Sequence, residues 1–459
     1  MLGEKCGVFG VSSLPNAIET TVIALHIVQH RGQESVGVSV VNNNTMTTRL
    51  KEGLVKVNFS EADSVKGLEG DSAIGHTRYS TTQSKSPLLD AQPIEMTLPN
   101  FSDMKVAIAH NGQLLDYEKL KKELVNQGAK FKTDSDTEII LQLLAKEDES
   151  DITKAIFNVL KKVKGGFAIV ILLEDGTLYA ARDEIGIRPL VLGKKNGSFA
   201  VASESCVFNA IDFECVREVE PGELLKIKGD KMESLRFAEK QRVRPCIFEL
   251  IYFARPDSLF LGKTIYERRK EIGRQLAKES PMKADMVIPI PDSGLPMAIG
   301  YSEESGIPFE YGIIRSHYAV RSFIQPKQTL RQKAILFKHN PNIDLLKGKD
   351  IILIDDSLVR GTTIKKLIAL IRKTDVKSIN VKIGSPMLKH KDIYGIDIPS
   401  ESELIANLKT LDEIKKEINA DTLTYLSIDG IYRAAGFESR DDKNPQMTDH
   451  YFTGDYPIR

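Results

Sequence analysis

The segment from Ile351 to Thr363 holds the densest group of residues able to do chemistry. A strand-like apolar run, Ile351–Ile354, ends in two adjacent carboxylates, Asp355 and Asp356, and a loop rich in serine, arginine, glycine and threonine follows. Ligands of open α/β sheets bind at the carboxyl ends of strands. A helix beginning near Thr363 would offer free N–H groups to a phosphate. This order of residues indicates a site for a phosphorylated sugar, with acids for its hydroxyls or for Mg²⁺.

A second group of motifs surrounds a cysteine close to the N-terminus. A thiolate can attack an amide carbonyl, and an α-amino group with a pKa of about 7.7–8.0 can accept the thiol proton. Singly, each motif also has an ordinary explanation, such as a small buried cysteine or a turn at Asn-Gly. The motifs are Cys6–Gly10, His30–Ser35, Gly75–Thr81, Ala109–Gly112 and Asp134–Glu138.

Together these motifs resemble class II glutamine amidotransferases, which are N-terminal-nucleophile hydrolases. The Ile351–Thr363 segment resembles the phosphoribosyl diphosphate motif of type I phosphoribosyltransferases. A chain with both halves is similar to the glutamine phosphoribosylpyrophosphate amidotransferase family, from Cys6 to about Gly430. The resemblance implies that glutamine, water and phosphoribosyl diphosphate give 5-phosphoribosylamine, glutamate and diphosphate, the first committed step of purine synthesis. Ammonia would pass between the two sites.

The resemblance also implies roles in the first half. Cys6 would be the nucleophile, and the Asn111 side chain with the Gly112 N–H would stabilise the oxyanion. Arg78, with Thr81 nearby, would bind the glutamine α-carboxylate, which a guanidinium matches with two parallel hydrogen bonds. Asp136 would bind the α-ammonium group.

In the second half the resemblance assigns the acids to the ribose and the following loop to the 5′-phosphate. Ser293, in Pro291–Gly294, would approach Mg²⁺ together with Asp355 and Asp356. Tyr252 is the expected gating residue, and Arg321 belongs to the expected lid. The residues expected to bind phosphoribosyl diphosphate are Asp355, Asp356, Ser357, Arg360, Gly361, Thr362 and Thr363.

The chain departs from the family pattern in three places. Met1–Lys5 precede Cys6 as a predicted propeptide, and catalysis through the α-amino group requires their removal. Some members bind a [4Fe–4S] cluster through four cysteines, whereas here Asp392 stands at one of these positions and only Cys246 remains, so we expect no iron–sulfur cluster. The lid differs from the family pattern at Arg315, Ser316 and Val320.

Short apolar runs and helical patterns predict the elements that position these motifs. These patterns indicate layered sheets with helices outside over residues 6–235, a parallel α/β sheet over 236–440 and a loosely ordered tail over 441–459. The resemblance implies that the first part is an N-terminal-nucleophile αββα sandwich and the second a phosphoribosyltransferase fold, so the fold class is α+β followed by α/β. Predicted strands of the second part include 286–290, 308–314, 350–354 and 379–383.

Composition restricts the partners. Lys+Arg and Asp+Glu both number 63, so no global field favours nucleic acid or a membrane, and no apolar run has membrane-spanning length. Scattered cysteines without a C-x-x-C pair suit the cytoplasm. The resemblance further implies a homodimer or homotetramer and feedback inhibition by purine nucleotides. A regulatory pseudoenzyme and a sugar-phosphate aminotransferase remain as alternatives.

Overall fold

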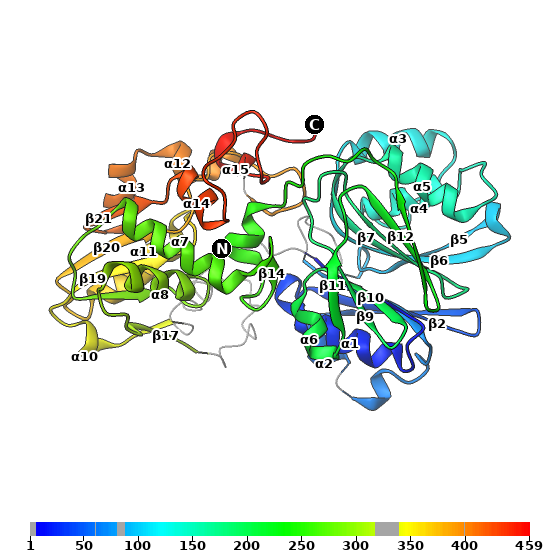
Figure 1. The fold of residues 1–459 in the computed structure, drawn as a ribbon, viewed down its shortest axis with the longest axis horizontal. Coiled ribbons are helices and arrows are strands. Elements are labelled where there is room, and N and C mark those ends of the chain that lie inside the picture. Colours follow the sequence, from blue (N-terminus) through cyan, green and yellow to red (C-terminus); the bar gives the residue numbers. More distant parts are fainter. Residues whose placement is uncertain (1–5, 60, 80–87, 317–338, 399) are drawn as a thin grey trace.

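The computed structural model describes residues 6–59, 61–79, 88–316, 339–398 and 400–459 (Figure 1). Its first half is a sandwich of two antiparallel sheets. The seven-stranded sheet runs in the order β11 (Glu214–Glu218), β9 (Val191–Lys195), β10 (Ser198–Ala202), β1 (Gly7–Ser12), β4 (Ser72–Arg78), β2 (Ser35–Asn42) and β3 (Thr45–Glu52). The six-stranded sheet runs in the order β13 (Lys231–Arg236), β12 (Glu223–Lys228), β8 (Leu178–Arg182), β7 (Gly165–Leu173), β6 (Met104–Leu114) and β5 (Ile94–Leu98).

Helices cover the outer faces of both sheets. Strands β1 and β7 are buried over their whole length, because each has a helical layer on one face and the other sheet on the other face. This confirms the predicted αββα sandwich. The helices are α1 (Ala17–Ile27), α2 (Val55–Asn58) and α6 (Cys206–Ile211) on one side, and α3 (Tyr117–Asn126), α4 (Thr137–Leu144) and α5 (Ile152–Lys162) on the other.

The second half is built on a four-stranded parallel sheet, as predicted. Its order is β16 (Met286–Pro289), β19 (Asp350–Asp355), β20 (Ser378–Ile383) and β21 (Thr422–Tyr425). The surrounding helices are α7 (Ile265–Glu279), α8 (Gly294–Ser305), α10 (Ile343–Leu346), α11 (Thr362–Arg372), α12 (Ile405–Leu408), α13 (Leu411–Ile418) and α14 (Ile428–Ala434). Helices α7 and α8 approach closely because Gly273 and Gly300 leave room: a Cβ on either would lie 1.9 Å from a carbonyl oxygen of the other helix.

The predicted strand over 308–314 was wrong as a member of this sheet. Phe309 makes only an isolated parallel bridge to Val287. The end of the run forms β17 (Ile313–Arg315), which pairs antiparallel with β18 (His339–Pro341) in a separate two-stranded sheet. The apolar run is too short and too interrupted by polar residues to support a full ladder.

The expectation of a loosely ordered tail was also wrong. His450 and Tyr451, in α15 (His450–Thr453), have no exposed surface. The Tyr451 hydroxyl lies 3.1 Å from the Cys246 sulfur, and His450 Nε2 lies 3.1 Å from Asp392 Oδ1. Despite its polar composition, the segment 441–459 therefore packs against the junction between the halves. Its contacts there are with Cys246 and Asp392, the two positions compared above with ligands of the iron–sulfur cluster.

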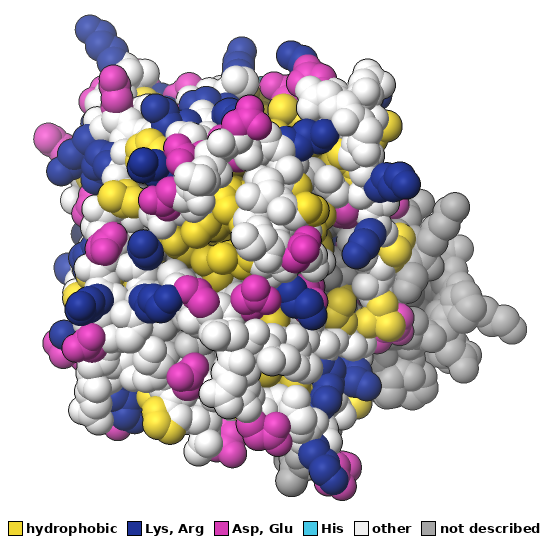
Figure 2. All heavy atoms as spheres, turned by 90° about the vertical axis from the view of Figure 1, so that its right-hand side faces the viewer, with side chains coloured by type: hydrophobic (Ala, Val, Ile, Leu, Met, Phe, Trp, Pro, Cys, Tyr) yellow, Lys and Arg dark blue, Asp and Glu magenta, His cyan; other side chains and the backbone are white. Residues whose placement is uncertain are grey.

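The surface agrees with the balanced composition. Figure 2 views the sandwich end of the molecule and shows basic and acidic side chains interspersed, with hydrophobic side chains gathered near the middle of that face. A mixed surface carries no field of one sign. Within the described ranges, no helix is both long enough and apolar enough to cross a membrane.

Candidate active site

The residues expected to act on glutamine come from both sheets of the sandwich. Cys6 immediately precedes β1, and Arg78 ends β4, which pairs with β1 so that Gly7 lies opposite Thr77. In the other sheet, β6 carries Asn111 and Gly112. The sheets are joined here, since His76 Nε2 lies 3.1 Å from the carbonyl oxygen of His110.

Cys6 is half-buried at this edge. Its sulfur lies 3.9 Å from the carbonyl oxygen of Tyr79, and its own carbonyl accepts a hydrogen bond of 3.2 Å from Arg31 Nε. The thiol therefore lies beside the strand end that carries Arg78, while its main chain is held from the other direction.

Asn111 has the features of an oxyanion ligand. Its side chain has no exposed surface, and neither its amide nitrogen nor its oxygen has a hydrogen-bond partner in the described part of the chain. Leaving such a group unsatisfied costs about 1–3 kcal/mol, so a ligand is the natural partner. Gly112 has φ +138°, and a Cβ there would lie 1.9 Å from the Gly166 carbonyl oxygen. Only glycine fits this backbone position.

Arg78 is buried, and Asp136 is largely buried, with 17% of its side chain exposed. Arg78 Nη2 donates to Asp90 Oδ2 at 3.3 Å, whereas Nη1 is buried without a partner among the described residues. Asp136 precedes α4, and its Oδ2 accepts a 2.7 Å hydrogen bond from the Leu114 N–H. Burial raises the pKa of Asp136 to about 6. A largely buried carboxylate and an incompletely bonded guanidinium suit the two charged ends of an amino acid.

Several supporting residues were missed in the sequence. Gln92 Oε1 accepts from the His110 N–H at 2.7 Å, and Gln92 Nε2 donates to Thr137 Oγ1 at 3.0 Å. His110 Nδ1 lies 3.1 Å from the same hydroxyl, so the network braces β6 against α4. His110 and Thr137 lie inside the motifs quoted above, which could have marked them, but nothing in the sequence distinguishes Gln92.

The acceptor residues lie at the carboxyl end of the parallel sheet. Asp355 ends β19, and the neighbouring Asp356 is 5% exposed. The hydroxyls of Ser293 and Ser357 both donate to the Asp356 carboxylate, so the ends of β16 and β19 are joined. Gly361, with φ 72°, caps α11, whose first residues are Thr362 and Thr363. The predicted loop and helix N-terminus thus adjoin the acids.

Electrostatics favour a cation at these acids. Burial raises the pKa of Asp355, and the adjacent Asp356 raises it further. Burial also raises the pKa of Asp356, against the opposing effects of its hydroxyl donors and of Arg269. Two adjacent carboxylates, Asp355 partly buried and Asp356 buried, and a serine hydroxyl are hard oxygen donors of the kind that Mg²⁺ prefers.

Other predicted residues fall around the acceptor site. Arg360 is half-exposed and pairs with Glu403 at 2.7 Å. Arg315 pairs with Asp292 beside Ser293. Tyr252 lies at the junction, partly buried, with its ring centroid 5.5 Å from that of Phe253. The predictions for Thr81, Arg321, Val320 and Met1–Lys5 lie outside the described residues.

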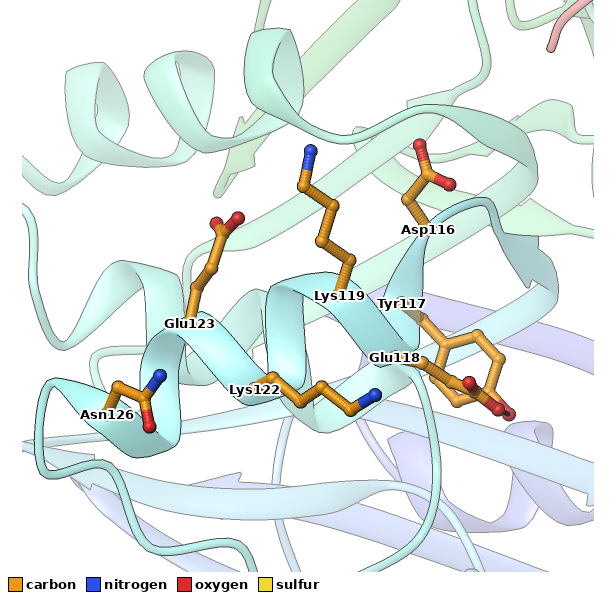
Figure 3. A pocket seen from close by; sticks show the side chains of 7 residues that line it. All are labelled: Asp116, Tyr117, Glu118, Lys119, Lys122, Glu123 and Asn126. Atoms are coloured by element: carbon orange, nitrogen blue, oxygen red, sulfur yellow. Dashed lines mark hydrogen bonds between the residues drawn. The ribbon is translucent and has the colours of Figure 1, made fainter.

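A separate shallow hollow of about 540 Å³ runs along α3 and brings none of these residues together. All of its lining side chains come from one helix and the residue before it, with both charge signs represented (Figure 3). Its lining is Asp116, Tyr117, Glu118, Lys119, Lys122, Glu123 and Asn126.

Comparison with protein families supports both halves. Residues 76–210 match the glutamine amidotransferase domain and residues 262–398 the phosphoribosyl transferase domain. An amidophosphoribosyltransferase of Rhizobium etli is 41% identical, covering 100% of this chain and 92% of that protein. One from Staphylococcus epidermidis is 40% identical, covering 99% of this chain and 91% of that protein.

Solved structures give the same answer for the fold. Glutamine phosphoribosylpyrophosphate amidotransferase from B. subtilis, complexed with ADP and GMP, superposes with a TM-score of 0.92 at 38% identity, covering 99% of this chain and 98% of that one. A structure described as the allosteric regulatory enzyme of purine biosynthesis has a TM-score of 0.93 at 38% identity, covering 99% and 96%.

Proposed function

The chain belongs to the amidophosphoribosyltransferase family, and on this premise we propose that it releases ammonia from glutamine at Cys6 and transfers it to phosphoribosyl diphosphate at Asp355 and Asp356. The products are 5-phosphoribosylamine, glutamate and diphosphate, in the first committed step of purine synthesis. The observation that carries the assignment is the Asn111 amide, buried and without a hydrogen-bond partner among the described residues, on a strand packed against β4, which pairs with the strand that follows Cys6.

In the glutaminase half, the Cys6 thiolate attacks the glutamine amide carbon. Asn111 and the Gly112 N–H stabilise the oxyanion, ammonia leaves, and water hydrolyses the thioester. Arg78 and Thr81 bind the α-carboxylate of glutamine and Asp136 its α-ammonium. The base is the α-amino group of Cys6, so the active form begins at Cys6 after removal of Met1–Lys5.

In the acceptor half, ammonia attacks the anomeric carbon of the ribose and diphosphate leaves. Asp355 and Asp356 hold the ribose hydroxyls, and the loop from Ser357 to Thr363 binds the 5′-phosphate at the N-terminus of α11. Ser293, Asp355 and Asp356 would hold Mg²⁺, which supplies neutralisation of the diphosphate charge when bound. The positive charge of Arg269 lowers the pKa of Asp356 and so favours the ionised carboxylate that a metal ion needs.

The junction must carry ammonia in its neutral, nucleophilic form. A passage closed to water prevents protonation and loss of the intermediate. Tyr252 borders the junction and is the proposed gate, with Arg321 in the lid. The assignment divides the chain into a propeptide (1–5), a glutaminase domain (6–235), a phosphoribosyltransferase domain (236–440) and a tail (441–459).

Further properties follow from the family. A purine nucleotide carries a ribose 5-phosphate and can compete for the Asp355–Thr363 loop, in line with the ADP and GMP bound in the B. subtilis structure. We propose such nucleotides as feedback inhibitors, a homodimer or homotetramer as the assembly, and the cytoplasm as the compartment.

Substitution of Cys6→Ala tests the two-site division. With glutamine, synthesis of phosphoribosylamine should fall at least about 10³-fold because the nucleophile is lost, whereas synthesis with ammonium salts should remain within about twofold. The matched control is Cys215→Ala, a half-buried cysteine on β11, which should preserve both rates. Loss of ammonia-dependent synthesis in Cys6→Ala would reject the division of labour. Wild-type binding of phosphoribosyl diphosphate without any synthesis would favour the regulatory pseudoenzyme.

A further inference from the structure

A buried ion pair at the junction reaches the main chain of the nucleophile. Arg31, 1% exposed, donates through Nη2 and Nη1 to the two carboxylate oxygens of Glu249 at 2.7 and 2.9 Å. The same guanidinium donates through Nε to the Cys6 carbonyl at 3.2 Å. Arg31 lies in the His30–Ser35 motif, to which the proposed reaction assigns no role. One planar group thus joins Cys6 to a carboxylate contributed by the segment that enters the second half.

Glu204 extends this contact across the junction. Its Oε1 accepts from Arg31 Nη1 at 2.7 Å and lies 2.7 Å from His30 Nε2, while its Oε2 accepts from the Arg255 N–H and the Ser258 hydroxyl at 2.9 and 2.7 Å. Burial disfavours the charged forms of both Arg31 and Glu204. Even so, Glu249 and Glu204 raise the pKa of Arg31, and His30 and Arg31 lower that of Glu204.

Glu249 is itself held in a rigid setting. It begins a π-helical turn, Glu249–Phe253, a form that is rare and frequent at functional sites. Arg269 of α7 bridges this turn: its Nε donates to the Leu250 carbonyl at 2.8 Å and its Nη2 to the Ala254 carbonyl at 2.9 Å. Both ends of the turn are bonded to one buried guanidinium, so the main chain that carries Glu249 is held in place. The Glu249 carboxylate therefore binds Arg31 from a fixed position.

Stability alone does not account for this arrangement. Desolvation offsets much of the attraction within a buried ion pair, so an apolar contact of similar size would stabilise the junction equally well. What a bidentate pair provides is fixed direction. Because the oriented guanidinium also donates to the Cys6 carbonyl, it fixes the main chain of the residue whose thiol must be placed against the glutamine amide.

We propose that Arg31 and Glu249 are positioning residues that fix the main chain of Cys6 and thereby set the attack geometry of its thiol. The inference rests on the proposed role of Cys6 as nucleophile. A misplacement of about 1 Å can cost on the order of 10²-fold in rate. Glutamine recognition uses Arg78 and Asp136 on other elements, so loss of the pair should lower kcat and spare KM.

The test is Glu249→Gln, which keeps the side-chain shape and leaves Arg31 its pair with Glu204. The kcat of glutamine hydrolysis should fall about 10- to 100-fold, with KM for glutamine and the kcat of ammonia-dependent synthesis within about twofold. The matched control is Glu223→Gln: this carboxylate, 3% exposed, forms a bidentate pair with Arg217 at 2.7 and 2.8 Å within the sandwich alone. The control should preserve all three constants.

Arg31→Lys provides an independent measurement if Glu249→Gln does not fold. A lysine keeps the charge but cannot bond Glu249 twice and the Cys6 carbonyl as well, so the same fall in kcat is expected. Provided that the wild-type chain uses glutamine, two results would overturn the positioning role. One is an unchanged kcat in either folded variant, and the other is a rise in KM that accounts for the whole loss of kcat/KM. A wild-type chain unable to use glutamine would instead overturn the proposed function, and this inference with it.

Discussion

The two candidate sites are assembled in opposite ways. The acceptor site comes mainly from one continuous segment, the end of β19 and the start of α11, joined by Ser293 from the neighbouring strand end. The glutamine site draws Cys6, Arg78, Asn111 and Asp136 from separate elements on two sheets and a helix. A continuous site inherits its geometry from one loop, whereas a dispersed site depends on how the whole sandwich packs. Local substitutions should therefore act differently in the two regions.

The sites also use buried acids differently. Asp355 and Asp356 adjoin one another, and a bound cation would relieve the repulsion between their charges. Asp136 has no second acid among its contacts within the described part of the chain: His110 Nδ1 lies 3.7 Å from its Oδ1, and burial is the main cause of its raised pKa. The first arrangement suits a polyanion bound with a metal ion, and the second a single ammonium group.

The largest expected effect is at the acceptor site. Replacing both acids (Asp355→Asn with Asp356→Asn) should lower synthesis at least about 10³-fold with either glutamine or ammonia, because the ribose and its metal lose their ligands. Initial rates with both nitrogen donors measure this. Glutamine hydrolysis at Cys6 in the absence of acceptor should continue.

A matched control lies at the other end of the same strand. Asp350 begins β19 and pairs with Lys377 and Ser378 on the surface. Asp350→Asn should leave both rates unchanged, since it perturbs the strand without touching its carboxyl end. Substantial synthesis by the double variant would refute the assignment of the ribose site and remove the contrast between the regions.

A smaller effect is expected from Asn111→Ala in the dispersed site. Loss of one oxyanion donor typically lowers kcat about 10²–10³-fold, and ammonia-dependent synthesis should be unaffected. Because the Asn111 amide makes no hydrogen bond within the described chain, the substitution removes none from the free protein. The melting temperature should accordingly change little, which a thermal unfolding scan can check. A large loss of stability with kcat intact would show that the amide is structural.

The sequence predicted the continuous site better than the dispersed one. The order of apolar strand, paired acids and phosphate-type loop was sufficient to place Asp355 at the end of a parallel strand and Thr363 at the start of a helix, where the structure has them. For the glutamine site, family motifs named the residues, but no spacing along the chain indicates that the strands carrying Arg78 and Asn111 pack against each other. That proximity arises from antiparallel pairing of β1 with β4 and from packing between the sheets.

The failures have physical causes. Residues 441–459 have a polar composition, yet Tyr451 lies against Cys246 and His450 against Asp392 in the interior, and these long-range partners cannot be read locally. Gln92 likewise acquires its bracing role only because β6 and α4 pack together. Arg31 lies in one of the quoted motifs, but its partner Glu249 is 218 residues away along the chain, so no local pattern could reveal the ion pair.

The smallest effect is a change in the pH profile that separates the two sites. Asp136 must be ionised to bind the glutamine ammonium, and burial raises its pKa to about 6. Protonation below that pH should lower kcat/KM for glutamine by an additional factor of about ten per pH unit. This loss adds to the fall caused by protonation of the Cys6 α-amino group, which begins at higher pH.

Comparison with Asp136→Asn isolates the contribution of this carboxyl. The variant should have a raised KM for glutamine at every pH and should lack the additional slope below pH 6, whereas the slope due to the α-amino group should persist in both proteins. Ammonia-dependent synthesis, expressed per concentration of unprotonated ammonia, serves as the internal control and should show no break assignable to Asp136. A break near pH 6 that survives in Asp136→Asn would assign the titration to another group. The contrast between an isolated acid that binds an ammonium and a paired set that binds a metal would then lose its main support.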